Sequence, residues 1–248
     1  MDLGITGRRA AVAAASSGLG FAAAERLAAE GVQVAICGSD HARIAAAAAR
    51  IGPGVTPLVA DLTDPDGCAR FVAEAEQALG GLDILVTNGP GPSAGTYATT
   101  AADAYPHALE LNLLSVVRMC YAAVPGMQQA GWGRIVAITS NAVRQPKPNL
   151  ILSNTARAGA TGFLKTLARE IAGDGITVNS VQPGLHATAR VESVYGDHLD
   201  EALAEVPTGV IGRPEDFGSV VAFLCSEPAR YITGAALAVD GGEDRALL

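Results

Sequence analysis

The feature that most constrains this chain is a regular alternation between short apolar runs and longer segments with helical spacing. The apolar runs are nearly unbroken, which is typical of strands that are covered on both faces. Strands that alternate with helices in this way indicate parallel strands joined by crossover connections. The runs that predict strands are 9–15, 32–37, 55–60, 82–87, 133–139, 176–182 and 236–240.

The segments between these runs predict helices, because their apolar residues recur every three or four positions. In 153–172, for example, Ala156, Ala160, Leu167 and Ile171 share one face. No repeat, low-complexity tail or linker divides the sequence, so we expect a single doubly wound α/β domain over 1–248. The predicted helices are 19–30, 41–51, 65–79, 102–130, 153–172 and 214–226.

The composition excludes several classes of protein. A hydrophobic content of 49% against 17% charged residues is typical of a folded domain and not of a disordered chain. The net charge of −8 argues against nucleic-acid binding and against anionic membranes, since both need a basic face. No apolar run reaches the roughly 20 residues that cross a bilayer, and AVAAA near the N-terminus is too short for a signal peptide.

The cysteines bear on the compartment. They lie at positions 37, 68, 120 and 225, with neither a C-x-x-C spacing nor the pattern of a secreted disulfide framework. Buried free thiols in a reducing cytosol are the default for such a set. We therefore expect a cytoplasmic protein without a metal site.

A glycine-rich turn, AAASSGLG at 13–20, follows the first strand and opens the first helix. The N–H groups at a helix N-terminus attract phosphate, and glycines let a phosphate approach the backbone closely. Ala14 stands where the first glycine of such a turn is expected. The position predicts a dinucleotide-binding turn, made of Ala14, Ser16, Ser17, Gly18, Leu19 and Gly20.

The end of the second strand, CGSD at 37–40, bears on the choice of dinucleotide. An acidic residue at the strand end holds the ribose hydroxyls of NAD and repels the 2′-phosphate of NADP. Gly38 and Ser39 leave room for that phosphate, and Arg43 lies one helical turn further on. These residues favour NADP over NAD; the alternative is that Arg43 is only a solvated helix residue.

Together with further motifs, these residues resemble the short-chain dehydrogenase/reductase family over essentially the whole chain. The resemblance implies a Rossmann-type sheet of seven strands with helices on both faces, a nicotinamide cofactor, and a homotetramer or homodimer. The helices at 102–130 and 153–172 would then pair between subunits. The motifs are DLTD at 61–64, TNGPG at 87–91, ELNLLSVV at 110–117, GRIVAITS at 133–140, QPG at 182–184 with Thr188, and YITGAALAVDGG at 231–242.

The resemblance also assigns residues to the site. It implies that Asn112 and Ser140 belong to the active site and orient the substrate oxygen. Besides the glycine-rich turn and Ser39, it implies that the cofactor is contacted by Asp61, Leu62, Asn88, Gly89, Arg157, Pro183, Gly184 and Thr188.

The catalytic positions of the family are altered in this chain. The family uses a tyrosine with a lysine four residues later, and a serine thirteen residues before the tyrosine. Counted from Ser140, these positions hold Ser153 and Arg157, and RAG at 157–159 matches the family's usual Lys-Ala-Gly. Arg157 keeps a cation on the same helix face as Ser153, so it is expected to hold the ribose, but arginine does not relay protons. A serine hydroxyl is a poorer acid than a phenol and reaches less far.

Two questions about the proton donor stay open at this stage. Ser153 is either a helix-terminal serine that satisfies backbone donors or a residue that still hydrogen-bonds the substrate. Another group would then supply the proton. The candidates are Arg144 and Lys147 after the fifth strand, Tyr97 after the fourth strand, and His186 and Tyr195 in a substrate loop at about 185–210.

Three functions are compatible with these residues. The first is an NAD(P)-dependent oxidoreductase that acts on a carbonyl or secondary alcohol of a small molecule through an atypical proton donor. The second is a non-redox enzyme in the same pocket, such as a dehydratase, an isomerase or a retro-aldolase. The third is a catalytically silent nucleotide-binding subunit that pairs with an active homologue. The predicted substrate loop indicates no substrate class.

Overall fold

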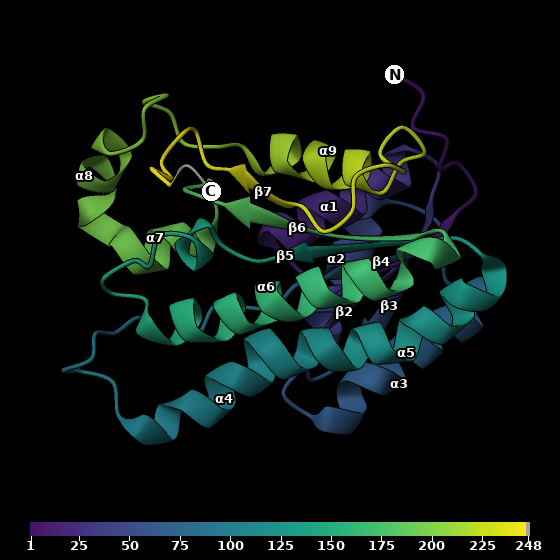
Figure 1. Cartoon of the computed structure of the whole chain (residues 1–248), viewed down its shortest axis with the longest axis horizontal. Helices are drawn as coiled ribbons and strands as arrows, with labels where there is room; N and C mark the ends of the chain where they lie inside the picture. Colours follow the sequence, from purple (N-terminus) through teal and green to yellow (C-terminus); the bar gives the residue numbers. More distant parts are fainter. Residues whose placement is uncertain (247–248) are drawn as a thin grey trace.

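The computed structural model, which describes residues 1–246, is built on one parallel sheet of seven strands. The strand order is β3-β2-β1-β4-β5-β6-β7, so the chain winds outward in both directions from β1 and β4. Every predicted strand is present, and the doubly wound α/β fold is confirmed (Figure 1). The strands are β1 (Arg9–Val12), β2 (Gln33–Gly38), β3 (Thr56–Val59), β4 (Ile84–Thr87), β5 (Gly133–Ile138), β6 (Ile176–Pro183) and β7 (Ala236–Val239).

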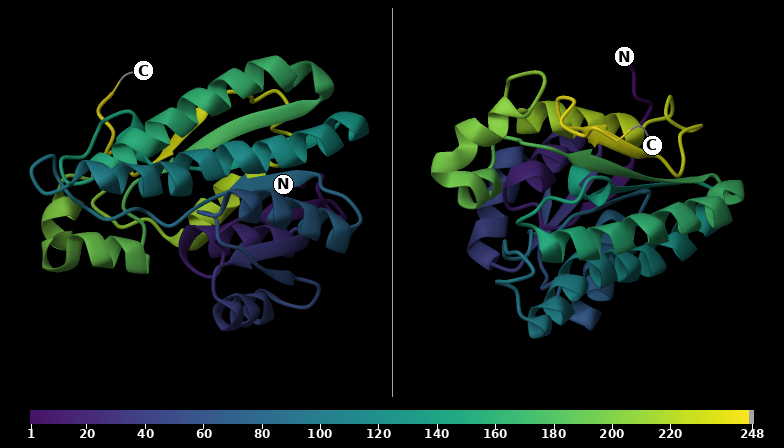
Figure 2. Two further views of the ribbon diagram at one scale, coloured as in Figure 1. Left: turned by 90° about the horizontal axis from the view of Figure 1, so that it is seen from below. Right: turned by 60° about the vertical axis from the view of Figure 1, so that its left-hand side comes forward.

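Helices cover both faces of this sheet (Figure 2). The helices α1, α2 and α9 pack on one face, and α3, α5 and α6 pack on the other. The α-helices of the described residues are α1 (Gly18–Ala29), α2 (His41–Ile51), α3 (Pro65–Leu79), α4 (Tyr105–Leu109), α5 (Ser115–Ala130), α6 (Ile151–Ile171), α7 (Ala189–Tyr195), α8 (Leu199–Ala204) and α9 (Pro214–Leu224).

The core is divided by the sheet into two apolar layers. Successive residues of a strand point to opposite faces, so Ala11 of β1 packs beneath α3 and α5 while Val12 packs beneath α1 and α9. Phe71 anchors the first layer and Phe217 the second, and both are fully buried. Burying such a side chain contributes about 1.5–3 kcal/mol. The nearly unbroken apolar runs in the sequence are thus explained by strands that are covered on both faces.

The predicted helix at 102–130 is present, but its geometry changes along its length. It begins with a 3-10 turn at Ala102–Ala104 and passes through a π-helical turn at Glu110–Leu114, between α4 and α5. Contrary to the expectation from the sequence, the stretch Ala102–Ala130 is long and apolar enough to cross a membrane, with a mean hydropathy of 1.2. However, 44% of its most apolar window is buried inside the protein, and α5 packs against α3 and α6.

The segment at 185–210, expected as the substrate loop, is largely helical, and its role toward a substrate stays a prediction. It forms α7, a 3-10 turn at Gly196–His198, and α8. Thr188 caps α7, because its hydroxyl accepts a hydrogen bond from the backbone N–H of Val191 at 3.4 Å. The helices are only one or two turns long, which is too short to show a clear apolar periodicity.

The cysteines of the described residues are free and buried, as the sequence predicts. Burial raises the pKa of Cys37, Cys120 and Cys225 to about 12, so these thiols stay protonated and unreactive at neutral pH. The part of the chain that the structure describes contains no group of three His, Cys, Asp or Glu side chains that could hold a metal ion.

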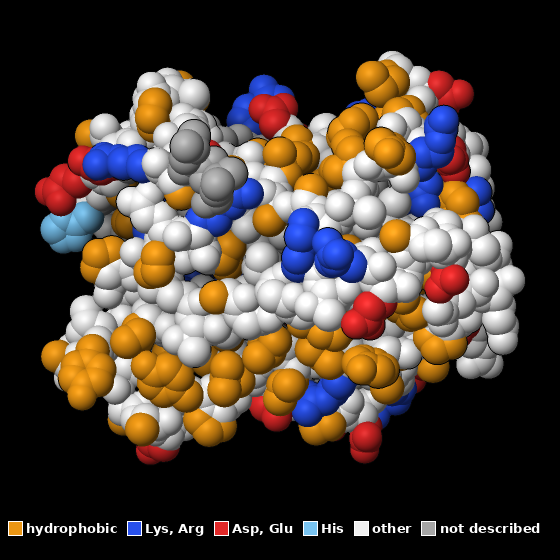
Figure 3. Space-filling view, in the orientation of Figure 1, with side chains coloured by type: hydrophobic (Ala, Val, Ile, Leu, Met, Phe, Trp, Pro, Cys, Tyr) orange, Lys and Arg blue, Asp and Glu red, His pale blue; other side chains and the backbone are white. Residues whose placement is uncertain are grey.

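The outer surface of the long helices bears on the predicted subunit contacts. Hydrophobic side chains gather over α4 and α5 in the lower part of Figure 3. On α5, Tyr121 is largely exposed and stacks on Phe163 of α6, with the ring centroids 6.5 Å apart. Tyr231, in the motif that the family uses for a subunit contact, is fully exposed. Pairing of these surfaces between subunits stays a prediction.

The start of β4 is fastened to β1 by the buried carboxylate of Asp83. This group accepts hydrogen bonds from the backbone N–H of Arg9 at 2.9 Å and from its Nε and Nη2 atoms at 2.8 and 2.9 Å. Burial opposes ionisation of Asp83, but the hydrogen bonds and the charge of Arg9 outweigh it, so the pKa of Asp83 is lowered. The ion pair therefore holds together the two central strands.

Replacing Asp83 by Asn is expected to destabilise the fold by about 2 kcal/mol at pH 7, because three charge-assisted hydrogen bonds are weakened. The folded pKa of Asp83 lies below its unfolded value, so its contribution is complete above about pH 5 and is lost as the pH falls through the folded pKa. Urea unfolding at pH 7, 5 and 3 should show the difference between the natural chain and Asp83→Asn shrinking at low pH. Asp103→Asn, at an exposed position, is the control. A difference that stays constant across this range would contradict the assignment.

Candidate functional site

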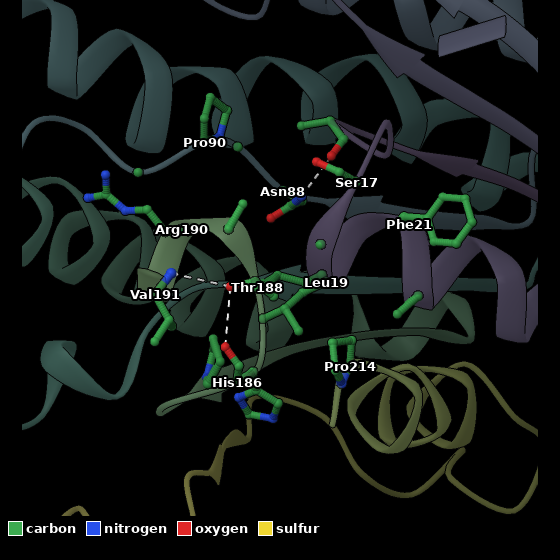
Figure 4. Close-up of a pocket in the computed structure, with 18 of the residues that line it drawn as sticks. Ser17, Leu19, Phe21, Asn88, Pro90, His186, Thr188, Arg190, Val191 and Pro214 are labelled. Atoms are coloured by element: carbon green, nitrogen blue, oxygen red, sulfur yellow. Dashed lines mark hydrogen bonds between the residues drawn. The ribbon is translucent and has the colours of Figure 1, made fainter. Parts of the chain in front are cut away.

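A cavity of about 960 Å³ opens at the carboxyl ends of the central strands. The strand order reverses between β1 and β4, so the loops that follow these two strands diverge and leave a crevice. Figure 4 shows residues from both sides of this crevice facing the same space. The predicted site residues that line it are Ala14, Ser16, Ser17, Gly18, Leu19, Ser39, Asp61, Leu62, Asn88, Gly89, Ser140, Ser153, Arg157, Pro183, Gly184 and Thr188.

Gly20 lies behind the cavity wall, and its lack of a side chain lets the start of α1 lie close to Asn88 at the end of β4. A Cβ atom at Gly20 would lie 2.6 Å from Nδ2 of Asn88 and 2.7 Å from the carbonyl oxygen of Ala14. Any side chain here would push α1 away from the end of β4. The same amide nitrogen of Asn88 donates to the Ala14 carbonyl at 3.1 Å and ties the two sides of the crevice together.

Asn112 is also placed behind the wall, and its expected role in orienting the substrate stays a prediction. It lies in the π-helical turn and is buried. Its Nδ2 atom donates to the carbonyl of Pro90 at 3.2 Å, and its Oδ1 atom is buried without a partner among the described residues. Asn112 therefore supports the segment after β4 and does not line the cavity.

The turn between β1 and α1 has the geometry that a diphosphate requires. Ser17 precedes α1, and its hydroxyl makes no capping hydrogen bond, so it is free to donate into the cavity. Gly18 has a φ of +63°, a conformation that glycine adopts at little cost, and Thr188 approaches it from the opposite wall. The N-terminus of α1, the hydroxyls of Ser16 and Ser17, and Thr188 thus surround one space. A dinucleotide fits these residues.

The far end of the cavity contains Ser39, Arg43 and Asp61. Asp40 caps α2 by accepting a hydrogen bond from the backbone N–H of Arg43 at 2.8 Å, so its carboxylate is engaged at the helix start. Hydrogen bonds from the backbone and the hydroxyl of Thr63 lower the pKa of Asp61 and keep it charged. With Arg50, which also borders this end, the cavity here offers a serine, two guanidinium groups and the carboxylates of Asp40 and Asp61.

The near end holds the two serines of the altered catalytic positions. Ser140 follows β5, and its Oγ accepts from the backbone N–H of Ala142 at 3.1 Å, which leaves its own proton free. α6 begins at Ile151 with Leu150 as its N-cap, so Ser153 lies inside the first turn and does not cap the helix. Its buried side chain borders the cavity.

Arg157 is turned toward backbone carbonyls. Its Nη1 atom donates to Ile138 at 2.9 Å and to Thr139 at 3.2 Å, and its Nη2 atom donates to Gly89 at 3.1 Å. Burial, with a smaller contribution from the positive charge of Arg190, lowers the pKa of Arg157 to about 10. The guanidinium therefore stays charged at neutral pH. It joins the end of β5 to the segment after β4, in addition to facing the cavity.

Arg190, at the start of α7, is a cavity residue that the sequence analysis missed. Its Nη2 atom donates to the carbonyl of Pro92 at 2.6 Å, and burial lowers its pKa. It is the one Lys or Arg between positions 185 and 210, and this isolated basic residue in the expected substrate loop was the sequence feature that pointed to it.

The proton-donor candidates separate into two groups. His186 borders the cavity, but its ring is largely buried against Phe217, its Nδ1 atom lies 3.2 Å from the Gly184 carbonyl, and burial lowers its pKa, so the ring is neutral at pH 7 and a poor acid. Tyr97 is exposed and, like Arg144, does not border the cavity. Lys147, which pairs with Glu243, and Tyr195 do border it.

Comparisons with known proteins agree with this geometry. The family described as enoyl-(acyl carrier protein) reductase matches residues 13–243. Dehydrogenase/reductase SDR family member 4 of Homo sapiens is 34% identical and covers 94% of this chain and 86% of its own length. The 3-oxoacyl-(acyl-carrier-protein) reductase FabG of Vibrio cholerae is 32% identical and covers 97% and 98%. The structure of L-sorbose reductase from Gluconobacter frateurii, complexed with NADPH and L-sorbose, has a TM-score of 0.91 at 32% identity and covers 100% of both chains.

Ala14 is the residue of the described chain that combines a side chain with a positive φ, of +48°. A left-handed conformation costs an L-residue about 1 kcal/mol, and glycine avoids this cost. Part of the gain is offset because glycine makes the unfolded chain more flexible, which favours the unfolded state. Ala14→Gly is therefore expected to stabilise the fold by about 0.5 kcal/mol and to raise Tm by about 1–2 °C. Ala15→Gly in the same turn, where φ is not positive, should lower Tm. Calorimetric scans of both variants check this, and a lower Tm for Ala14→Gly would contradict it.

Proposed function

Because the chain belongs to the short-chain dehydrogenase/reductase family, we propose that it is an NAD(P)-dependent oxidoreductase that interconverts a carbonyl and an alcohol of a small molecule. The observation that carries this proposal is one continuous cavity, which joins the phosphate-binding turn at Ser17–Gly18 to the hydroxyls of Ser140 and Ser153. Two relatives are reductases by name, and one of them was solved with NADPH.

The residues at the far end of the cavity support NADP as the preferred cofactor. Ser39 and Arg43 offer a hydroxyl and a positive charge where a 2′-phosphate would lie. Arg50 also borders this end and stacks on Phe21, with its guanidinium carbon 4.4 Å from the ring centroid. Asp40, the nearest acid, is held by the start of α2.

When bound, the nicotinamide supplies the hydride. The chain's own residues then act on the substrate oxygen. The free proton of Ser140 donates to this oxygen, and Ser153 offers a second hydroxyl from α6. The positive charge of Arg157, which borders the cavity, stabilises the negative charge that develops there. The hydroxyls of Ser153 and Ser140 pass a proton from solvent to the oxygen in place of the missing phenol.

A catalytically silent nucleotide-binding subunit is the second candidate. The observation that favours it is the loss of the phenol at position 153, which removes the family's acid while the phosphate-binding turn stays intact. A non-redox enzyme in the same pocket is the remaining alternative. Binding and turnover measured separately distinguish these from the oxidoreductase.

We expect NADPH to bind at least tenfold more tightly than NADH, because Arg43 and Ser39 meet the 2′-phosphate with charge-assisted hydrogen bonds, worth roughly 1.5 kcal/mol or more. Fluorescence titration of both cofactors measures this ratio. Ser39→Asp should reverse the preference, and Thr166→Asp on the outer face of α6 is the control for added charge. If neither cofactor binds, the oxidoreductase proposal fails.

With a panel of carbonyl compounds followed at 340 nm, the natural chain is expected to oxidise NADPH slowly. Ser140→Ala should lower kcat by about 10²-fold, as is usual when one donor to a developing oxyanion is removed. The double variant Ser153→Tyr/Arg157→Lys should be faster than the natural chain, because it restores a phenol and an ammonium.

Two outcomes would contradict this scheme. If only the double variant turns over, the natural protein is not a reductase. If Lys147→Gln or Tyr195→Phe abolishes a natural activity, the proton comes from that residue and not through the serines.

A further inference from the structure

Two guanidinium groups converge on one short segment at the near end of the cavity. Arg157 donates to the carbonyl of Gly89 at 3.1 Å, and Arg190 donates to the carbonyl of Pro92 at 2.6 Å. Arg190 also lies against Gly91, since a Cβ atom there would be 2.8 Å from its Nε. Both side chains border the cavity, one from α6 and the other from α7.

Neither guanidinium has an acidic partner within residues 1–246. The other two basic residues nearby are neutralised, because Lys147 pairs with Glu243 and Arg144 lies 4.0 Å from Asp244. Arg157 and Arg190 bond to backbone carbonyls alone. Two like charges that are partly withdrawn from water destabilise a fold unless a counter-charge arrives. Burial accordingly lowers the pKa of both groups.

Each guanidinium has donors to spare. An arginine carries five N–H groups, and the Nε atoms of both residues make no hydrogen bond to any described residue. Ser153 is short, so it leaves open the volume beside Arg157 that a larger side chain would fill. An incoming group with two or more acceptor oxygens would find unused donors and uncompensated charge together.

The phosphate-binding turn supplies no counter-charge to this pair. The phosphate-binding turn surrounds Ser17 and Gly18, whereas Arg190 lies beside Pro90 on the other side of the crevice (Figure 4). An anionic group on the second ligand of the cavity would supply the counter-charge. The cavity of about 960 Å³ would hold the dinucleotide and this second ligand together, so the second ligand is small.

We propose that the substrate of this protein is a small oxo compound that carries an oxyanion, a carboxylate or a phosphate ester, held by Arg190 and Arg157 beside the reacting carbonyl. The substrate role rests on the proposed function, but the binding of the anion does not. Arg190 is the main specificity residue, because its guanidinium has the fewest structural bonds.

The test compares anionic compounds with matched neutral ones by titration calorimetry on the enzyme saturated with NADP⁺. The pairs are pyruvate with methyl pyruvate, acetoacetate with methyl acetoacetate, and dihydroxyacetone phosphate with dihydroxyacetone. At least one anion is expected to bind about tenfold or more tightly than its neutral partner, as a charge-assisted pair provides. The pair that shows the preference identifies the oxyanion as a carboxylate or a phosphate.

Variants of Arg190 decide whether the guanidinium is responsible. Arg190→Gln should abolish the preference for the anion, and Arg190→Lys should retain part of it. Arg70→Gln, which removes an exposed arginine on α3, is the matched control and should leave the preference unchanged. Circular dichroism and Tm establish that each variant is folded.

The inference is overturned if acids and their neutral partners bind equally well, if no compound of either kind binds, or if the preference survives in Arg190→Gln. Because calorimetry needs no hydride transfer, a silent subunit would still show the preference while the oxidoreductase proposal failed. Conversely, an enzyme that reduces acids and esters with equal efficiency would uphold the proposed function and overturn this inference alone.

Discussion

The reversal of strand order between β1 and β4 is the constraint on which the rest of this structure depends. The loops that leave these strands diverge, and the gap they leave must be bridged for the crevice to keep its shape. Asn88, directly after β4, makes that bridge with its hydrogen bond to Ala14. Asp83, directly before β4, ties the opposite ends of the same two strands together through Arg9. β1 and β4 are thus joined at both ends by polar side chains that flank β4. The positive φ of Ala14 is the local strain that this arrangement tolerates.

Position 157 shows how the choice between arginine and lysine changes the hydrogen bonds of a site. A guanidinium is planar and offers five donors in a fixed fork, whereas an ammonium is a compact charge on a flexible stem. The guanidinium of Arg157 donates hydrogen bonds to the backbone carbonyls of Ile138, Thr139 and Gly89 at the same time. It thereby becomes part of the wall and remains a charge in the cavity. Arginine stays protonated in proteins, so the residue at this position does not relay protons.

The sequence was sufficient for the parts of the fold that depend on periodicity. The seven strands and the long helices carry unbroken or three-to-four-residue apolar patterns, and those patterns follow directly from burial. The short helices α7 and α8 were missed because they have too few turns to display a period. The position of Asn112 was missed for another reason: it belongs to a motif that predicts nearness to the site, and only three-dimensional packing decides whether a side chain faces the cavity or the core. Arg190 was overlooked because its importance arises from having no acidic partner nearby, which no linear pattern reveals.

The two arginines of the site are positively charged, whereas the molecule as a whole carries a negative net charge. A chain with a net charge of −8 repels anions at long range, and the acids Asp40, Asp61 and Glu215 at the cavity edge share that sign. At physiological ionic strength, however, exposed charges are screened over about 8 Å, so this repulsion mainly slows the approach of an anion. Inside the cavity, a charge about 4 Å from a guanidinium gains roughly 4 kcal/mol at an effective dielectric constant of about 20. The local pair of Arg157 and Arg190 therefore outweighs the distant acids. An acidic protein and an anionic ligand are compatible here because the short-range interaction decides affinity, while the net charge affects only the rate of encounter.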